Sequence, residues 1–272
     1  MKRPTKVILS TFIVSALIFF AAFTVLPLPG TVPVLMYHFI DTPERAREEK
    51  NVVSRGSFAF QMAFLRFFGY HVISLNEFYE IETGQRKPRG RELVLTFDDG
   101  NYTFETNAYP ILAKYSFPVT LFVVSESVKQ ETNGSLSAPS LKKLLGTGWI
   151  AAESHSKTHP SLSTMTEDQI KEELVGSKED LEELLGTPIR YLSYPNGDLD
   201  ERVVKIAQEA GYRLAFTTAS KKLKGLPEGP MTLARVKISR SSDNPFVFWL
   251  KVSGLYHVFK RERYRFKNLL KD

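Results

Sequence analysis

The sequence predicts an α/β fold, an irregular (β/α)7–8 barrel preceded by one N-terminal transmembrane helix. Eight short apolar segments, rich in β-branched and aromatic residues, alternate with helical patterns over about 240 residues. Strands that alternate with helices build a parallel sheet with helical crossovers. A run of twenty uncharged residues before the first strand predicts the membrane helix. A doubly wound open sheet is the alternative arrangement of these elements.

Residues 1–30 differ in composition from the rest of the chain. Residues 1–6 are basic and residues 7–26 are uncharged, a run longer than the ~7–15 apolar residues of a typical signal peptide. Because no small-x-small cleavage site follows, we expect a membrane anchor or an uncleaved signal. The basic flank predicts a single-pass protein of the cell membrane, extracytoplasmic after Gly30, or a secreted one if the N-terminus is cleaved.

The charge and cysteine content exclude several classes of protein. The chain has no cysteine, so disulfides, thiolate metal sites and cysteine nucleophiles are absent. Residues 1–6 contribute +3 and residues 250–272 contribute +5 to the net charge of +6, which leaves −2 for the residues between. We therefore expect no nucleic-acid partner. The segment 250–272 is typical of a basic amphipathic helix, suited to an anionic membrane or polymer or merely solvated.

The first elements of the predicted domain, residues 31–249, follow from local patterns. Residues 33–39 are an apolar run typical of a strand, and the polar residues 41–56 predict a long loop. A helix with one apolar face follows, with Ser57 as its N-cap and Gly69 as its stop.

The next elements repeat this alternation. A strand is predicted at 71–75, and it runs into a helix that Ser74 and Glu77 begin as a capping box. The apolar run 92–97 is the next strand, and a helix over 105–116 follows it.

The remaining elements end the barrel pattern. The clearest helix has leucines and an isoleucine on one face and ends at Gly186. The predicted strands are 119–124, 149–155, 189–195, 212–218 and 235–239, and the predicted helices are 140–148, 166–185 and 200–211.

Unusual polar residues follow four of the predicted strands. His38, the pair Asp98 and Asp99, His155 and the turn 194–197 each come where a strand ends. The carboxyl ends of barrel strands form the active-site mouth, so we expect these side chains to lie together. A plain acidic turn is the alternative for the two aspartates, and a buried core histidine is the alternative for His38.

A candidate metal site follows from His155 and His159. Three residues separate the two histidines, a spacing that places two imidazoles on one side of a helical turn. Together with Asp99 they supply two nitrogens and one carboxylate oxygen, a three-ligand set with open positions that is typical of hydrolytic metal sites. Surface or capping histidines are the alternative interpretation.

Four motifs give the chain a family resemblance over residues 32–240. It resembles the polysaccharide deacetylase family, the NodB-homology carbohydrate esterases of family 4. One motif further resembles the subgroup that deacetylates poly-N-acetylglucosamine-type polymers. The motifs are TFDDG (96–100), HSKTH (155–159), SYPNG (193–197) and, for the subgroup, MYHFI (36–40).

The resemblance implies a role for each site residue. Asp98 would be the general base, and a divalent metal, usually zinc, would be held by three ligands. A backbone N–H at Asn196 would bind the oxyanion, and His38 would replace the family's late histidine as general acid. Arg235 is a hypothesis for the partner that orients Asp98, because Ser193 occupies the position of the family's arginine. The three metal ligands implied are Asp99, His155 and His159.

The expected function is that of a metal-dependent polysaccharide N-deacetylase. It would remove N-acetyl groups from amino sugars of an extracytoplasmic polysaccharide, its main partner, while the N-terminal helix contacts the membrane. Two alternatives remain: a non-catalytic carbohydrate-binding protein on the same fold, and an amidase acting on another N-acylated cell-wall substrate. The family's missing late histidine and missing arginine support the first of these alternatives.

Overall fold

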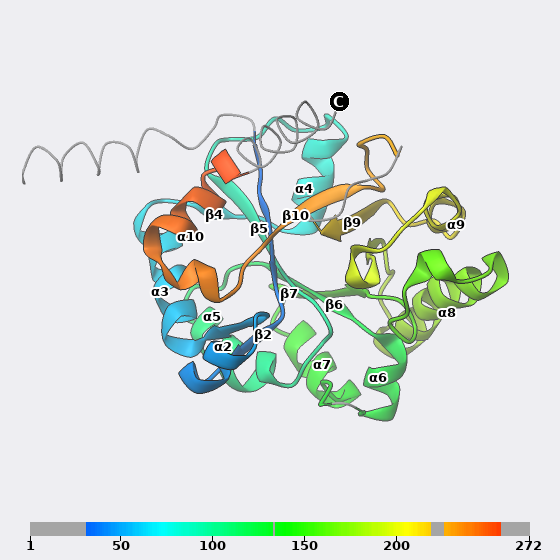
Figure 1. Ribbon diagram of the computed structural model, residues 1–272, viewed down its shortest axis with the longest axis horizontal. Helices are drawn as coiled ribbons and strands as arrows, with labels where there is room; N and C mark the ends of the chain where they lie inside the picture. Colours follow the sequence, from blue (N-terminus) through cyan, green and yellow to red (C-terminus); the bar gives the residue numbers. More distant parts are fainter. Residues whose placement is uncertain (1–30, 133, 219–225, 257–272) are drawn as a thin grey trace, which may run out of the picture.

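The computed structural model describes residues 31–132, 134–218 and 226–256. In this part of the chain, eight parallel strands form one sheet in the order β1-β10-β9-β8-β7-β6-β5-β4, and β1 also pairs with β5. The second pairing closes a seven-stranded barrel, with β4 attached beside the start of β5 (Figure 1). The predicted barrel is confirmed, and the alternative of an open doubly wound sheet is wrong.

All eight predicted strands are present. Those of the barrel are almost continuously buried, because helices cover the outer face and side chains fill the inner one. The strands are β1 Val34–Tyr37, β4 His71–Val72, β5 Glu92–Phe97, β6 Val119–Val123, β7 Ile150–Ser154, β8 Tyr191–Ser193, β9 Leu214–Thr218 and β10 Leu233–Lys237.

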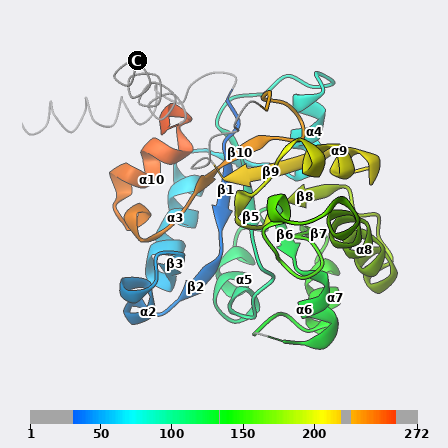
Figure 2. The same ribbon diagram turned by 45° about the vertical axis from the view of Figure 1, so that its right-hand side comes forward.

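Helices surround the barrel on its outer side, as Figures 1 and 2 show. The predicted capping box of Ser74 and Glu77 is formed, and Gly186 ends α8 in the left-handed conformation. The α-helices are α2 Pro43–Glu48, α3 Arg55–Phe67, α4 Leu75–Glu82, α5 Tyr109–Leu112, α6 Ser125–Gln130, α7 Ala138–Leu145, α8 Glu167–Leu185, α9 Glu201–Glu209 and α10 Pro245–Val252, with a π-helix η1 (Phe104–Ala108) and 3₁₀ turns η2 (Leu162–Thr164), η3 (Pro195–Gly197) and η4 (Arg240–Asp243).

The prediction of a long loop at residues 41–56 is wrong. This segment contains α2 and the strand β3 (Val52–Ser54), which pairs with β2 (Phe39–Asp41) in a small parallel sheet. These elements are too short to show a period in the sequence. The cap of α3 also differs, because Ser54 rather than Ser57 accepts a hydrogen bond at its first turn.

The predicted helix 105–116 is interrupted. Residues Phe104–Ala108 form a π-helix, and a short α-helix continues to Leu112. Pro110 lies at this junction and has no N–H to donate to the helix ladder. A regular α-helix therefore cannot pass through it without losing a hydrogen bond.

The predicted anchor at residues 1–30 lies outside the described residues, as does most of the predicted helix 250–272. Within the described ranges, no helix has the length and apolar character needed to cross a bilayer. The predicted boundary between residues 249 and 250 falls inside α10. The division into anchor, domain and C-terminal helix stays a prediction.

Candidate active site

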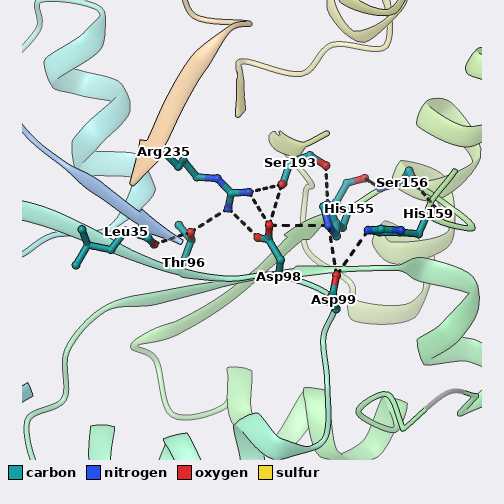
Figure 3. Close-up of polar contacts among 10 residues, drawn as sticks. Leu35, Thr96, Asp98, Asp99, His155, Ser156, His159, Ser193 and Arg235 are labelled. Atoms are coloured by element: carbon teal, nitrogen blue, oxygen red, sulfur yellow. Dashed lines mark hydrogen bonds and ion pairs between the residues drawn. The ribbon is translucent and has the colours of Figure 1, made fainter. Parts of the chain in front are cut away.

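The predicted site residues from β5 and β7 come together at the carboxyl end of the barrel. Figure 3 shows Asp98, Asp99, His155 and His159 pointing toward one another, with Arg235 of β10 beside them. Asp98 and Asp99 directly follow β5, and His155 directly follows β7. Because all strands of the barrel are parallel, with β6 alone between β5 and β7, their carboxyl ends share one edge.

Asp99, His155 and His159 form a candidate metal centre. Oδ1 of Asp99 lies 3.5 Å from Nε2 of His155 and 3.6 Å from Nε2 of His159. Ligands that each lie about 2.1 Å from one tetrahedral cation are about 3.4 Å apart. Their spacing therefore fits one divalent cation, and the two-nitrogen, one-oxygen donor set suits zinc.

The two histidines converge through a loop, so the expected helical turn is wrong. Residues 155–160 are not helical, and Ser156 and His159 adopt positive φ angles of 64° and 67°. The N–H of His159 donates to Oγ of Ser156 at 3.0 Å, and the N–H of Ser156 donates to Oγ of Ser154 at 3.2 Å. These hydrogen bonds stabilise a backbone that non-glycine residues seldom adopt.

His155 is held in one orientation by the backbone of β8. Its Nδ1 lies 2.7 Å from the carbonyl oxygen of Ser193, which leaves Nε2 free to bind a cation. Burial lowers the pKa of His155, but the nearby carboxylates of Asp98 and Asp99 raise it by more. The pKa of His155 therefore lies above its ordinary value. Burial and its neighbour His155 lower the pKa of His159.

Asp98 is not one of the candidate metal ligands, because its carboxylate is paired with Arg235. The guanidinium donates to both carboxylate oxygens, at 2.7 and 2.6 Å, and both side chains are buried. Burial alone raises the pKa of Asp98, but Arg235 and His155 lower it well below its usual range. The structure therefore places Arg235 where the sequence hypothesis put it.

Two hydroxyl groups hold Arg235 in place, and the sequence analysis missed both. The guanidinium donates to Oγ of Ser193 at 2.6 Å and to Oγ1 of Thr96 at 3.0 Å. The hydroxyl of Thr96 in turn donates to the carbonyl of Leu35 at 2.8 Å. Ser193 lies in a motif that marked a strand end, whereas a threonine inside an apolar strand gives no such signal.

His38 lies between β1 and β2, beside Asp98 in the barrel register, because the N–H of Asp98 donates to the carbonyl of Tyr37. Nδ1 of His38 is buried and has no hydrogen-bond partner among the described residues. Burial lowers the pKa of this histidine, while the carboxylates of Asp98 and Asp99 oppose that shift. The role of His38 as general acid stays a prediction.

Asn196 lies in the turn η3 after β8. It is exposed and has a left-handed backbone, with φ 56°. The next residue, Gly197, packs against Thr218, since a methyl group added there would lie 2.7 Å from the Thr218 backbone nitrogen. The turn is thereby fixed against β9, while the oxyanion role of Asn196 stays a prediction.

A cavity of about 380 Å³ opens beside Asp99 and His159. Its wall combines hydroxyl and amide groups with one aromatic ring, groups that hydrogen-bond to and pack against a sugar. The other lining residues are Phe39, Asn101, Val124, Ser127, Thr132, Ser135 and Thr158.

Comparison with known proteins relates this chain to one family. Residues 85–215 match the family profile described as polysaccharide deacetylase. YxkH of Bacillus subtilis (strain 168), named as a polysaccharide deacetylase, is 30% identical over 215 residues, which are 78% of this chain and 72% of YxkH. The poly-β-1,6-N-acetyl-D-glucosamine N-deacetylase of Staphylococcus aureus (strain MSSA476) is 29% identical over 196 residues, 68% of this chain and 67% of that protein.

Solved structures show the same relationship. The Streptococcus pyogenes deacetylase PplD, in complex with acetate, aligns with a TM-score of 0.70 and 26% identity, covering 81% of this chain and 98% of PplD. BC0361, a polysaccharide deacetylase from Bacillus cereus, aligns with a TM-score of 0.69 and 30% identity, covering 80% of this chain and 68% of BC0361.

Proposed function

The chain belongs to the polysaccharide deacetylase family of hydrolases, and on this premise we propose a metal-dependent enzyme that removes N-acetyl groups from amino sugars of an extracytoplasmic polysaccharide. One observation carries the proposal. Three ligand atoms of Asp99, His155 and His159 lie within 4.8 Å of one another, and Asp98, paired with Arg235, lies beside them. This is the arrangement that metal-assisted hydrolysis of an amide requires.

We propose zinc as the cation, held by Asp99, His155 and His159. When bound there, a divalent cation would polarise the acetyl carbonyl and lower the pKa of a water molecule. Asp98 accepts the proton of the attacking water, and its pairing with Arg235 keeps the carboxylate ionised and off the cation.

The proposed roles of Asn196 and His38 rest on their positions, which follow the carboxyl ends of β8 and β1. The backbone N–H of Asn196 would donate to the oxyanion, and His38 would give a proton to the departing amine. Burial lowers the pKa of His38 and so disfavours its protonated form, whereas the carboxylates of Asp98 and Asp99 favour that form.

For the substrate, we propose a β-linked polymer of N-acetylglucosamine. The hydroxyl- and amide-lined cavity next to Asp99 has the chemistry to hold a sugar ring at the candidate metal centre. The similarity to the Staphylococcus aureus poly-β-1,6-N-acetyl-D-glucosamine N-deacetylase supports the same substrate class. The buried pair of Asp98 and Arg235 argues against a purely carbohydrate-binding protein, because binding a glycan does not need a buried ionised base.

Acetate release from N-acetylglucosamine oligomers tests this proposal. We expect EDTA to abolish release, zinc or cobalt to restore it, and Asp99→Ala to remove it under all conditions. Asp168→Ala, at an exposed position in the first turn of α8, is the control that should keep full activity. Glycan binding without acetate release at metal saturation would contradict the proposal. A panel of N-acylated cell-wall substrates, followed by mass spectrometry, separates it from an amidase.

A further inference from the structure

Glu173 of α8 is a buried carboxylate that contacts the loop carrying both metal-ligating histidines. It is 5% exposed, and three groups of the loop donate to it. The N–H groups of Lys157 and Thr158 donate to Oε2 at 3.0 and 2.8 Å, and the hydroxyl of Thr158 donates to Oε1 at 2.5 Å. One side chain therefore fixes the middle of the segment between His155 and His159.

The loop needs such a support because its backbone is unfavourable. Ser156 and His159, on either side of the bonded residues, have the left-handed φ angles that non-glycine residues seldom adopt. The helix that carries Glu173 is firmly packed, since Leu174 and Leu181 on its apolar face are fully buried. The carboxylate also satisfies two backbone N–H groups that helix or strand bonding does not.

We propose that Glu173 is a positioning residue for the candidate metal centre. By holding residues 157 and 158, it sets the distance of 3.6 Å between His159 Nε2 and Asp99 Oδ1. It acts through the backbone rather than through an imidazole, and it touches neither the cation nor the substrate. This role rests on the proposed metal-dependent function.

Metal affinity, measured by competition with a chromogenic zinc chelator, tests the role of Glu173. We expect Glu173→Ala to weaken zinc binding about 10- to 100-fold, because alanine has no group that can accept the three hydrogen bonds from the loop. The matched control is Glu172→Ala, at the neighbouring exposed carboxylate, which pairs with the Lys157 ammonium group instead of the backbone. Thr158→Val, which removes one of the three bonds, should weaken binding less.

The outcomes separate the role of Glu173 from the proposed function. Unchanged affinity in Glu173→Ala, or an equal loss in Glu172→Ala, overturns the positioning role alone. A wild-type protein without zinc affinity overturns the proposed function and this role with it. If Glu173→Ala does not fold, Thr158→Val decides, because an unchanged affinity in that variant overturns the role as well.

A second inference concerns exposed aromatic residues on two neighbouring helices. We call Phe60 and Phe67 of α3 and Phe246 of α10 the α3–α10 face. Their exposed fractions are 46%, 76% and 50%, and in the described part of the chain Tyr102 is the one other large hydrophobic side chain this exposed. The helices pack through an edge-to-face contact of Phe64 and Phe248, with ring centroids 5.6 Å apart. Figures 1 and 2 show α3 and α10 side by side.

Both ends of the described chain meet next to this face. Gly254, just after α10, packs so closely on Thr31 that an added methyl group would collide with it. The chain before Thr31 contains the uncharged run 7–26, and the chain after Tyr256 carries a net charge of +4 over residues 257–272. Neither α3 nor α10 contains an acidic residue.

We propose that the α3–α10 face lies against an anionic lipid bilayer. Phenylalanine side chains on a helix surface can enter the boundary between headgroups and acyl chains, and basic segments next to a membrane helix bind anionic lipids. Since Thr31 precedes β1, the described chain begins at the amino end of the barrel, and the candidate active site lies at the opposite, carboxyl end. This inference rests on the proposed extracytoplasmic location.

Site-directed fluorescence tests this contact, because the chain has no native cysteine. The full chain is placed in nanodiscs of phosphatidylglycerol and phosphatidylcholine, and single cysteines are labelled with bimane. We expect brominated acyl chains to quench the label by at least half in Phe67→Cys and Phe246→Cys. The label in Lys205→Cys, on the exposed surface of α9 across the barrel, should keep its fluorescence.

A reporter in the predicted anchor distinguishes two kinds of failure. Quenching in Ser15→Cys without quenching at positions 67 and 246 overturns the contact of the α3–α10 face alone. No quenching in Ser15→Cys overturns the predicted anchor, and the contact with it. Equal quenching at positions 67, 246 and 205 indicates nonspecific adsorption and also overturns the proposed face.

Discussion

At the scale of single residues, the site depends on the pairing of Asp98 with Arg235. An isolated buried carboxylate would keep its proton, because burial disfavours the charged form. Arg235 reverses this preference with two hydrogen bonds, and hydroxyl groups of Thr96 and Ser193 fix the guanidinium plane. The charge and the direction of Asp98 are therefore set by Arg235, which comes from β10.

Arg235→Lys tests this dependence. Lysine keeps the charge but loses the planar fork that binds both oxygens of Asp98. We expect deacetylation to fall about 100-fold, since a displaced base costs about that much, while zinc affinity stays near the wild-type value. Acetate release and chelator competition are the two measurements. Near-wild-type activity would contradict the orienting role of Arg235.

His38→Gln tests the proposed general acid at the same scale. Glutamine keeps hydrogen-bonding groups of similar size but cannot transfer a proton, so we expect activity to fall about 100-fold or more. Zinc affinity and the midpoint of thermal unfolding should change little, because His38 is not one of the three predicted ligands. A purely structural histidine would instead lower the melting temperature and leave the activity of the folded fraction unchanged.

At the scale of elements, the turn η3 combines a strained backbone with close packing. Gly197 has φ 63°, and an added methyl group would lie 2.7 Å from the backbone nitrogen of Thr218. Gly186 at the end of α8 has a similar φ of 67° but open space around it. Comparing the two glycines separates the effect of backbone strain from that of collision.

We expect Gly186→Ala to lower the free energy of unfolding by about 1–2 kcal/mol, the cost of a left-handed alanine. Gly197→Ala should cost about 2–5 kcal/mol, because the collision with a backbone atom adds an overpacking term. It should also reduce acetate release, since it displaces the neighbouring Asn196. Denaturant unfolding measures the stability of both variants. An equal loss of unfolding free energy in the two would show that Thr218 moves aside at no cost in stability.

At the scale of the whole molecule, the candidate metal centre joins the ends of two barrel strands, β5 and β7, through Asp99 and His155. A ligand that binds only the folded state stabilises it according to its concentration and affinity. At a zinc concentration 100 times the dissociation constant, the gain is about 2.7 kcal/mol. This corresponds to a rise of about 5–10 °C in Tm for a chain of this length.

Differential scanning fluorimetry with zinc and then with EDTA checks this expectation. The Tm should rise with zinc and return with EDTA in the wild-type protein, whereas Asp99→Ala should show no shift. An equal shift in Asp99→Ala would place the stabilising ion elsewhere in the molecule.

Much of this fold was predictable because parallel barrel strands are buried on both faces. β5 and β6 therefore appear in the sequence as continuous apolar runs, and α8 shows a clear apolar period with a cap at each end. The small sheet of β2 and β3 was missed, because three-residue strands carry too few residues to show a pattern. The π-helix was missed because it depends on a local irregularity near Pro110.

The sequence by itself determined the strand order along the chain and the candidate ligands Asp99, His155 and His159. Residues that follow strand ends must meet at one edge of a parallel barrel, so local patterns were sufficient for them. The tertiary structure alone decided which groups support these residues. Asp98 and Arg235 lie 137 positions apart, and Glu173 meets Thr158 from a separate helix. Such pairs form because the closed barrel brings distant segments together, and no local pattern in the sequence indicates which distant segments meet.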